Sequence, residues 1–173
     1  MKPVENASEG AGREGAQMAL AIRFVHTNIV ARDWKTLARF YIEVFGCRKK
    51  PPERNLGGAW LDKATSLKGA HIRGIHLRLP GYGADGPTLE IFQYSKQRNR
   101  KAAVINTPGF THIAFSVRDV GKVLEKVERC GGRRVGEIVS TEIEGAGPID
   151  FVYARDPEGN IIELQKWNEP AAR

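Results

Sequence analysis

Long hydrophobic runs are missing from this chain of 173 residues. No apolar segment approaches the roughly 20 residues needed to cross a bilayer, so we expect no membrane partner. The first 21 residues have neither the basic start nor the apolar centre of a signal peptide, and a disordered tail is predicted over 1–21. Since 41% of the residues are hydrophobic, the remainder can bury a core. These features predict a globular, cytoplasmic protein.

Cysteine is also scarce, with only two residues in the chain. Cys47 and Cys130 lie far apart and outside any CxxC spacing. A disulfide framework or a cysteine-rich zinc site needs more cysteines at closer spacing. The sequence therefore predicts two free, largely buried thiols.

Recognition helices, zinc fingers and ribonucleoprotein motifs are absent, although the net charge is +7. The basic residues gather in 48–50, 96–101 and 133–134. Charge runs of this kind are usually solvated surface, so no specific nucleic-acid partner is expected. A positive field would instead draw in anionic small molecules.

What the chain does contain is an internal repeat. The segment FVHTNIVARD starts at residue 24 and FTHIAFSVRD starts at residue 110, so that His26 and His112 are 86 positions apart. The same offset relates Asp33 to Asp119. Each copy later reaches a strand-like segment with one acid, TLEIFQY with Glu90 and NIIELQKW with Glu163. Two histidines and two glutamates in equivalent places can hold a divalent metal ion.

The secondary structure is expected to repeat with the sequence. A β-rich segment leads to Asp33, which can cap a helix that ends at Gly46, and Asp119 and Gly131 play the same parts in the second copy. Strands are predicted around 48–50, 59–61, 72–79 and 88–94, then around 134–138, 149–154 and 160–167, with a tight turn over 156–159. The sequence thus predicts an α+β fold of two βαβββ units, 22–94 and 109–167, joined by a basic linker over 95–108.

Paired βαβββ units with a histidine in the first strand and a glutamate in the last, together with the ending DPEGNIIEL, resemble the vicinal oxygen chelate superfamily. That superfamily includes glyoxalase I, methylmalonyl-CoA epimerase, extradiol dioxygenases, and the fosfomycin and bleomycin resistance proteins. The resemblance covers residues 22–167. It implies that the two units curl into a half-barrel around one metal ion, with His26, Glu90, His112 and Glu163 as its ligands.

Ligand chemistry supports this set independently. Two neutral imidazoles and two carboxylates balance a divalent cation and leave room in an octahedral shell for two substrate oxygens. One ion per site is expected, with Ni, Co, Mn, Fe and Zn all compatible with these ligands. His71 and His76 have no repeat partner and are predicted to be ordinary strand residues, with His76 as a candidate for a contact behind the ligands.

Strand alternation predicts the wall around the metal, because side chains two positions apart share a face. The faces that carry the ligands should also present Val30 and Ala114 and the expected substrate-pocket residues Asn28, Phe92, Tyr94, Ser116, Gln165 and Trp167. This mixed wall suits a substrate with an oxygen pair at the metal and a flat or apolar portion further out.

Differences between this sequence and the residue patterns of individual families in the superfamily reduce the number of possible activities. Glyoxalase I usually carries an Arg four residues after its first ligand and an Asn four after its second, both contacting glutathione. Here these positions are Val30 and Tyr94, which argues against glutathione. Epimerases often have Gln at the second ligand position, while ring-cleaving dioxygenases and fosfomycin resistance proteins use three ligands, so Glu90 disfavours all three. Bleomycin-binding proteins generally lack a metal.

The resulting prediction is a glyoxalase-I-like, metal-dependent lyase or isomerase that abstracts a proton from a small oxygen-chelating substrate and stabilises an enediolate. Glu163 is the first choice for the base and Glu90 the second. The alternatives are an acyl-CoA epimerase of the methylmalonyl-CoA type, a dioxygenase of the same superfamily, and a resistance-type binding protein. A homodimer is expected, with the metal site either within one chain or across the dimer interface.

Overall fold

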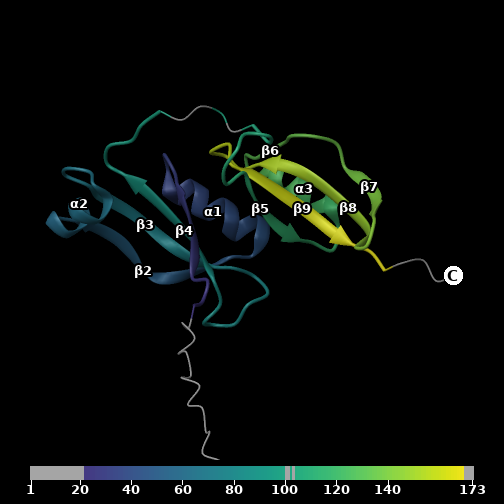
Figure 1. Ribbon diagram of the computed structural model, residues 1–173, viewed down its shortest axis with the longest axis horizontal. Coiled ribbons are helices and arrows are strands. Elements are labelled where there is room, and N and C mark those ends of the chain that lie inside the picture. The colour runs from purple at the N-terminus through teal and green to yellow at the C-terminus, as the bar shows by residue number, and fades with distance from the viewer. Residues whose placement is uncertain (1–21, 100–101, 103, 170–173) are drawn as a thin grey trace, which may run out of the picture.

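The computed structural model describes residues 22–99, 102 and 104–169, so the predicted tail over 1–21 lies outside the described residues. Two successive units follow each other along the chain (Figure 1). The first contains β1 (His26–Val30), α1 (Trp34–Phe45), β2 (Arg48–Gly57), α2 (Ala59–Thr65), β3 (His71–Arg78) and β4 (Thr88–Tyr94). The second contains β5 (His112–Ser116), α3 (Val120–Arg129), β6 (Arg133–Arg134), β7 (Val139–Ile143), β8 (Gly147–Arg155) and β9 (Ile161–Trp167).

Each unit forms its own mixed sheet, and the predicted α+β class is confirmed. The first sheet has the order β1-β4-β3-β2, and the second has the order β5-β9-β8-β6 with β7 paired to β8. The first strand of each unit runs parallel to the last, and the other pairs are antiparallel. The repeat seen in the sequence is therefore also a repeat of topology.

Both main helices begin where the sequence predicts, and α1 also ends at the predicted glycine, whereas α3 ends at Arg129 with Cys130 at its C-cap, one residue before the predicted Gly131. The Asp33 carboxylate accepts hydrogen bonds from the backbone N–H groups of Lys35 and Thr36, at 3.0 and 3.2 Å, and thereby satisfies two donors of the first turn. Helix α1 ends at Gly46, whose φ of 71° is accessible to glycine without strain. In the second unit Asp119 accepts from the backbone N–H of Lys122 at 3.0 Å.

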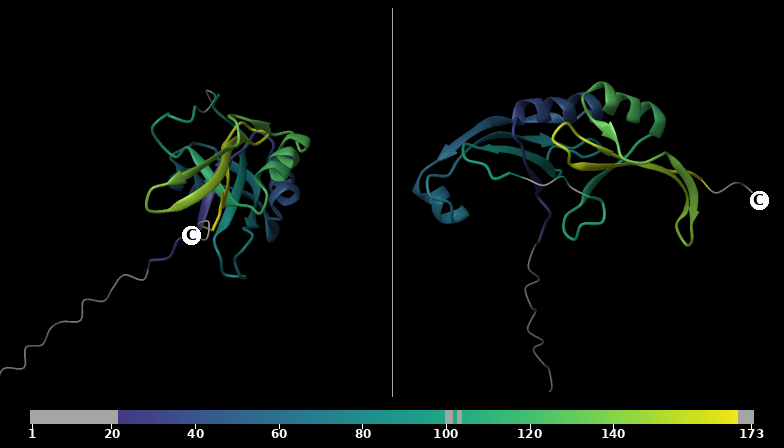
Figure 2. Two further views of the ribbon diagram at one scale, coloured as in Figure 1. Left: turned by 90° about the vertical axis from the view of Figure 1, so that its right-hand side faces the viewer. Right: turned by 90° about the horizontal axis from the view of Figure 1, so that it is seen from above.

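One hydrophobic core serves both units. Helices α1 and α3 contact each other and lie on the same side of the two sheets (Figure 2). The ring of Phe45 at the end of α1 stacks on Phe115 of β5 with ring centroids 4.0 Å apart. Buried residues of the same cluster come from both helices and both sheets, including Leu37, Tyr41, Leu89, Leu124, Ile162 and Leu164. The predicted ligands lie on the faces of the two sheets that point away from these helices.

Two strand predictions are wrong. Residues 59–61 open helix α2 instead, after Gly58 at its N-cap. The Asp62 carboxylate in this helix accepts from the backbone N–H groups of Gly69 and Ala70, which fixes the loop to β3. In the second unit the strand expected around 134–138 is reduced to Arg133–Arg134, and a further strand forms at Val139–Ile143. All five residues of this strand are exposed, so it lacks the alternation that would have indicated it.

Cys47 is buried and Cys130 is partly buried, and both are free thiols as predicted. Burial is the main reason why the pKa of Cys47 rises to about 12, so its thiol stays protonated at neutral pH. No helix among residues 22–99, 102 and 104–169 is long and apolar enough to cross a bilayer.

Candidate metal centre

The first predicted ligand pair lies on β1 and β4. Nε2 of His26 is 3.6 Å from Oε2 of Glu90, and Nε2 of His76 on β3 is 2.8 Å from the other oxygen, Oε1. The amide of Asn28 donates to Oε2 of Glu90 at 2.8 Å. The strand register explains this convergence, because Glu90 lies opposite Asn28 on one side and opposite His76 on the other. The first unit therefore surrounds one carboxylate with three polar side chains.

The second pair has the same construction. Nε2 of His112 on β5 is 3.0 Å from Oε2 of Glu163 on β9. In the strand register Glu163 lies opposite Ala114 and Tyr153, the positions that Asn28 and His76 occupy around Glu90 in the first unit. Burial raises the pKa of Tyr153, and the negative charge of Glu163 and hydrogen bonding to its carboxylate raise this pKa further.

Two of the three His–Glu spacings fit adjacent ligands of one metal ion. Ligand bonds of about 2.1 Å place two adjacent ligands of an octahedral shell about 3 Å apart. The separations of 2.8 Å for His76 and Glu90 and of 3.0 Å for His112 and Glu163 match that value. The predicted ligand His26 lies farther from Glu90, at 3.6 Å. Imidazole nitrogens and carboxylate oxygens are also ligands that the expected divalent cations accept.

The two pairs do not form one cluster within a single chain. Among the described residues, only His26, His76 and Glu90 form a group of three or more potential ligands whose atoms lie within 4.8 Å of one another. His112 and Glu163 lie outside this group. The structure thus presents the predicted four-ligand set as two separate halves, one on each sheet.

Comparison with known proteins identifies the family of the chain. The family model described as "Glyoxalase/Bleomycin resistance protein/Dioxygenase superfamily" matches residues 23–164, nearly the whole described chain. The chain belongs to this superfamily. This finding confirms the resemblance to the vicinal oxygen chelate proteins that the repeat indicated.

Two curated proteins match the chain at low sequence identity. Lactoylglutathione lyase GLX1 of Arabidopsis thaliana is 27% identical over 146 residues, which cover 82% of this chain and 43% of that protein. The chain therefore spans less than half of the plant enzyme. Protein YwbC of Bacillus subtilis is 28% identical over 148 residues, covering 84% of this chain and 98% of YwbC.

Solved structures of the superfamily share the fold. A glyoxalase family protein from Bacillus cereus superposes with a TM-score of 0.69 at 19% identity, over 88% of this chain and 97% of that one. A glyoxalase I mutant from Zea mays superposes with a TM-score of 0.54 at 23% identity, over 83% of this chain and 44% of that one. At these identities the likeness concerns the fold alone.

His76 is the main residue that the structure adds to the predicted ligand set. We expected an ordinary strand residue, with a contact behind the ligands as the alternative, and the structure puts its Nε2 directly against Glu90. Its Nδ1 is 3.1 Å from the hydroxyl of Thr88. Burial is the largest influence on the pKa of His76 and lowers it, which favours the neutral imidazole that binds metals.

The remaining predicted pocket residues lie on the expected strands. Phe92 packs edge to face near His76, with ring centroids 6.0 Å apart. Ser116 and Gln165 are register partners on β5 and β9, and Trp167 at the end of β9 is 45% exposed. A small cavity of about 290 Å³ between β1 and β5 includes Asn28 and His112 in its lining.

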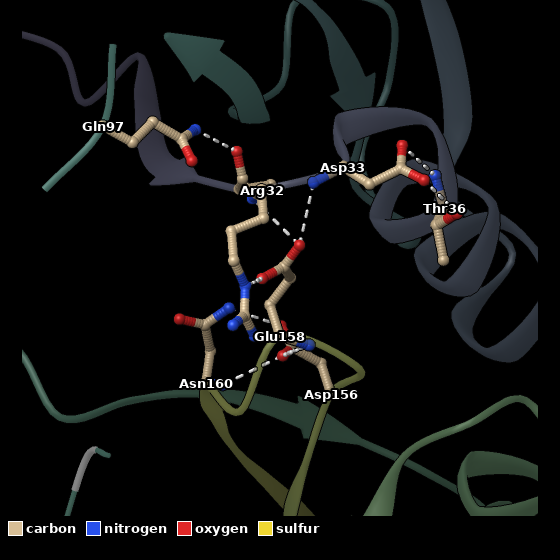
Figure 3. Close-up of polar contacts among 8 residues, drawn as sticks. Arg32, Asp33, Thr36, Gln97, Asp156, Glu158 and Asn160 are labelled. Atoms are coloured by element: carbon tan, nitrogen blue, oxygen red, sulfur yellow. Dashed lines mark hydrogen bonds and ion pairs between the residues drawn. The ribbon is translucent and has the colours of Figure 1, made fainter. Parts of the chain in front are cut away.

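A polar joint connects the two units of this superfamily member close to β1 (Figure 3). The Glu158 carboxylate, in the turn between β8 and β9, accepts from the backbone N–H groups of Arg32 and Asp33, both at 2.9 Å. Nε of Arg32 donates to the other Glu158 oxygen at 2.9 Å. Behind this turn, buried Asp156 accepts from the hydroxyl of Tyr41 at 3.1 Å. The joint fixes the second unit against the segment between β1 and α1.

Proposed function

We propose that this chain is a metal-dependent lyase or isomerase of the glyoxalase I type, acting on a small substrate that offers two neighbouring oxygens. The observation that carries the proposal is the repeated His–Glu pair, His26 with Glu90 and His112 with Glu163, at the same register positions of two sheets. A divalent ion held by these four residues would supply Lewis-acid stabilisation for negative charge on the oxygen pair, as in an enediolate.

The contacts of Glu90 and Glu163 differ, and this difference supports different roles for the two carboxylates. Glu90 is held at both oxygens, by Asn28 and by His76, each at 2.8 Å. Glu163 has Tyr153 in place of the histidine, but the position equivalent to Asn28 is Ala114, which has no hydrogen-bond donor in its side chain. Nε2 of His112 also lies 3.0 Å from Glu163, so Glu163 has two polar neighbours where Glu90 has three, His26, Asn28 and His76. This smaller number of contacts supports Glu163 as the base that turns away and takes a proton, and Glu90 as a fixed ligand.

A proton-exchange experiment tests this division. Metal-loaded protein is incubated in D₂O with hydroxyacetone and with dihydroxyacetone phosphate, and exchange at the carbon next to the carbonyl is followed by NMR. Glu163→Gln should keep the fold and lower the exchange rate by roughly two to four orders of magnitude, since the amide cannot act as a base. Glu90→Gln should cost less. Equal exchange rates in wild type and both variants would remove proton abstraction by either carboxylate from the proposal.

We further propose that a second copy of the chain completes the metal site. Within the described residues of one chain the two halves lie apart, and each carries one histidine and one glutamate of the predicted set. In a twofold dimer, the first unit of one protomer can face the second unit of its partner, which gives two equivalent sites per dimer.

Subunit mixing tests the shared site. His26→Ala and His112→Ala each damage both sites of their own homodimer. In a mixed dimer of these two variants, one site loses both histidines and the other is intact, so about one ion per dimer should bind. A mixed dimer that binds no more metal than either homodimer would place the whole site within one chain.

The runner-up is an acyl-CoA epimerase, and one observation favours it. Basic side chains surround a large cavity beyond the ends of β1 and β4, where a phosphorylated carrier would find counter-charges. Both activities need the same metal-assisted proton transfer, and they differ in what the remainder of the substrate carries.

A further inference from the structure

A cavity of about 950 Å³ lies between the two units. The first unit contributes the ends of β1 and β4 and the loop before β3, and the second contributes the turn between β8 and β9. The segment that follows β4 forms another side, with Ser95, Lys96, Gln97 and Arg98. The side chain of Gln97 donates to the carbonyl oxygen of Ala31 at 2.6 Å, which ties this segment to the body of the protein.

Charge is the unusual property of this cavity. Glu158 is its only acidic residue, and its oxygens already accept the hydrogen bonds of the joint. Six basic residues line the same space: Arg32, Lys68, Lys96, Arg98, Arg133 and Arg155. No carboxylate of residues 22–99, 102 and 104–169 forms an ion pair within 4.0 Å with Lys68, Lys96, Arg98 or Arg133. We refer to this space as the basic cavity.

The basic cavity is continuous with the face that carries the first ligand pair. Val30 and Tyr94 line it, and they lie on β1 and β4, four residues beyond His26 and Glu90 and on the same faces of these strands. Four residues of a strand span about 13 Å. A ligand that reaches from the metal centre into the basic cavity must therefore be an extended molecule.

We propose that the basic cavity binds a phosphate-bearing group, and that the substrate of the neighbouring centre carries such a group about 13 Å from its oxygen pair. Arginine presents a planar fork of donors that matches phosphate oxygens, and four of the six basic residues are arginines. The volume suits a small molecule up to nucleotide size, whereas a duplex nucleic acid would not fit. The link to the substrate rests on the proposed function, but binding of phosphate in the cavity does not.

Direct binding measurements test the proposal. Protein freed of metal by a chelator and then dialysed is titrated calorimetrically with inorganic pyrophosphate, ADP and adenosine, so that binding to a metal ion cannot contribute. Pyrophosphate and ADP should bind, and adenosine should not. A higher affinity for ADP than for pyrophosphate would indicate a nucleotide-borne phosphate, and equal affinities would indicate a simple phosphate ester.

A matched pair of double variants locates the binding. Lys96→Gln with Arg98→Gln removes two charges from the basic cavity and should weaken pyrophosphate binding about tenfold or more for each charge. Arg39→Gln with Lys63→Gln removes two exposed charges outside the cavity and should change the affinity little. This comparison separates a local site from the general positive field of the protein.

Three results would overturn the proposal: no binding of pyrophosphate or ADP to the wild type, equal losses in the two double variants, or tighter binding of a single-stranded oligonucleotide than of ADP. Each concerns the basic cavity alone. The metal content of the Lys96/Arg98 variant should equal that of the wild type, so failure of the metal centre would be recognised separately.

Discussion

Glu158 joins the two units, and its replacement should reveal which of its contacts stabilises the protein. Its side chain is 14% exposed, whereas that of Arg32 is 79% exposed. An exposed ion pair contributes about 0.5 kcal/mol, so Arg32→Ala should cost little. The two hydrogen bonds from backbone N–H groups to the carboxylate contribute about 1.5 kcal/mol each. Glu158→Ala should therefore lower the free energy of unfolding by about 3 kcal/mol.

Thermal and urea unfolding measure this difference. For a chain of this size, about 3 kcal/mol corresponds to a decrease in Tm of about 6–12 °C. Glu137→Ala, which removes an exposed glutamate elsewhere in the second unit, serves as the control and should stay near the wild type. If Arg32→Ala destabilises the protein as much as Glu158→Ala, the ion pair rather than the backbone contacts holds the joint, and the reasoning is refuted.

Three further outcomes are expected. Asp156→Ala should lower the free energy of unfolding by about 3 kcal/mol in urea titrations, because four hydrogen-bond donors lose a buried acceptor. A decrease in this free energy no larger than that of a typical surface variant would contradict the prediction. Hydrogen bonds from Thr36 lower the pKa of Asp33. The ionised carboxylate therefore stabilises the folded protein fully above the usual pKa of 3.8, and this contribution is lost as the pH falls through the lowered pKa. Asp33→Asn should abolish this part of the acid dependence of Tm. With Val30 and Tyr94 at the positions of the glutathione contacts, turnover of methylglyoxal with glutathione should be lower by roughly two orders of magnitude or more than that of a dedicated glyoxalase, and a comparable kcat/KM would show the opposite.

Local signals in the sequence were sufficient for helices α1 and α3 and for the final hairpin. Asp33 and Gly46 set the ends of α1 through contacts within a few residues. The turn before β9 is equally local, since the backbone N–H of Gly159 donates to the carbonyl oxygen of Asp156 at 2.9 Å. Helix α2 was missed because its N-cap, Gly58, offers no side-chain acceptor, and its first residues resemble a strand.

Contacts across the sheet could not be predicted from the repeat alone. His76 was set aside because no histidine matches it in the second unit, yet the register shows that Tyr153 occupies the equivalent place beside Glu163. When equivalent positions carry different residue types, a comparison of the sequences of the two units does not reveal that they correspond. The contact between Glu158 and Arg32 joins residues 126 positions apart, and only the packed units bring them together.

Metal occupancy in single histidine variants tests the central claim, that both His–Glu pairs hold one ion. Purified protein is loaded with Ni, Co, Mn, Fe or Zn and desalted, and the bound metal is determined by mass spectrometry. The account predicts about one ion per chain in the wild type and in His71→Ala, a histidine outside the predicted ligand set, and a large loss in both His26→Ala and His112→Ala. Full occupancy in His112→Ala would show that the first unit binds the ion alone, and would contradict the shared centre.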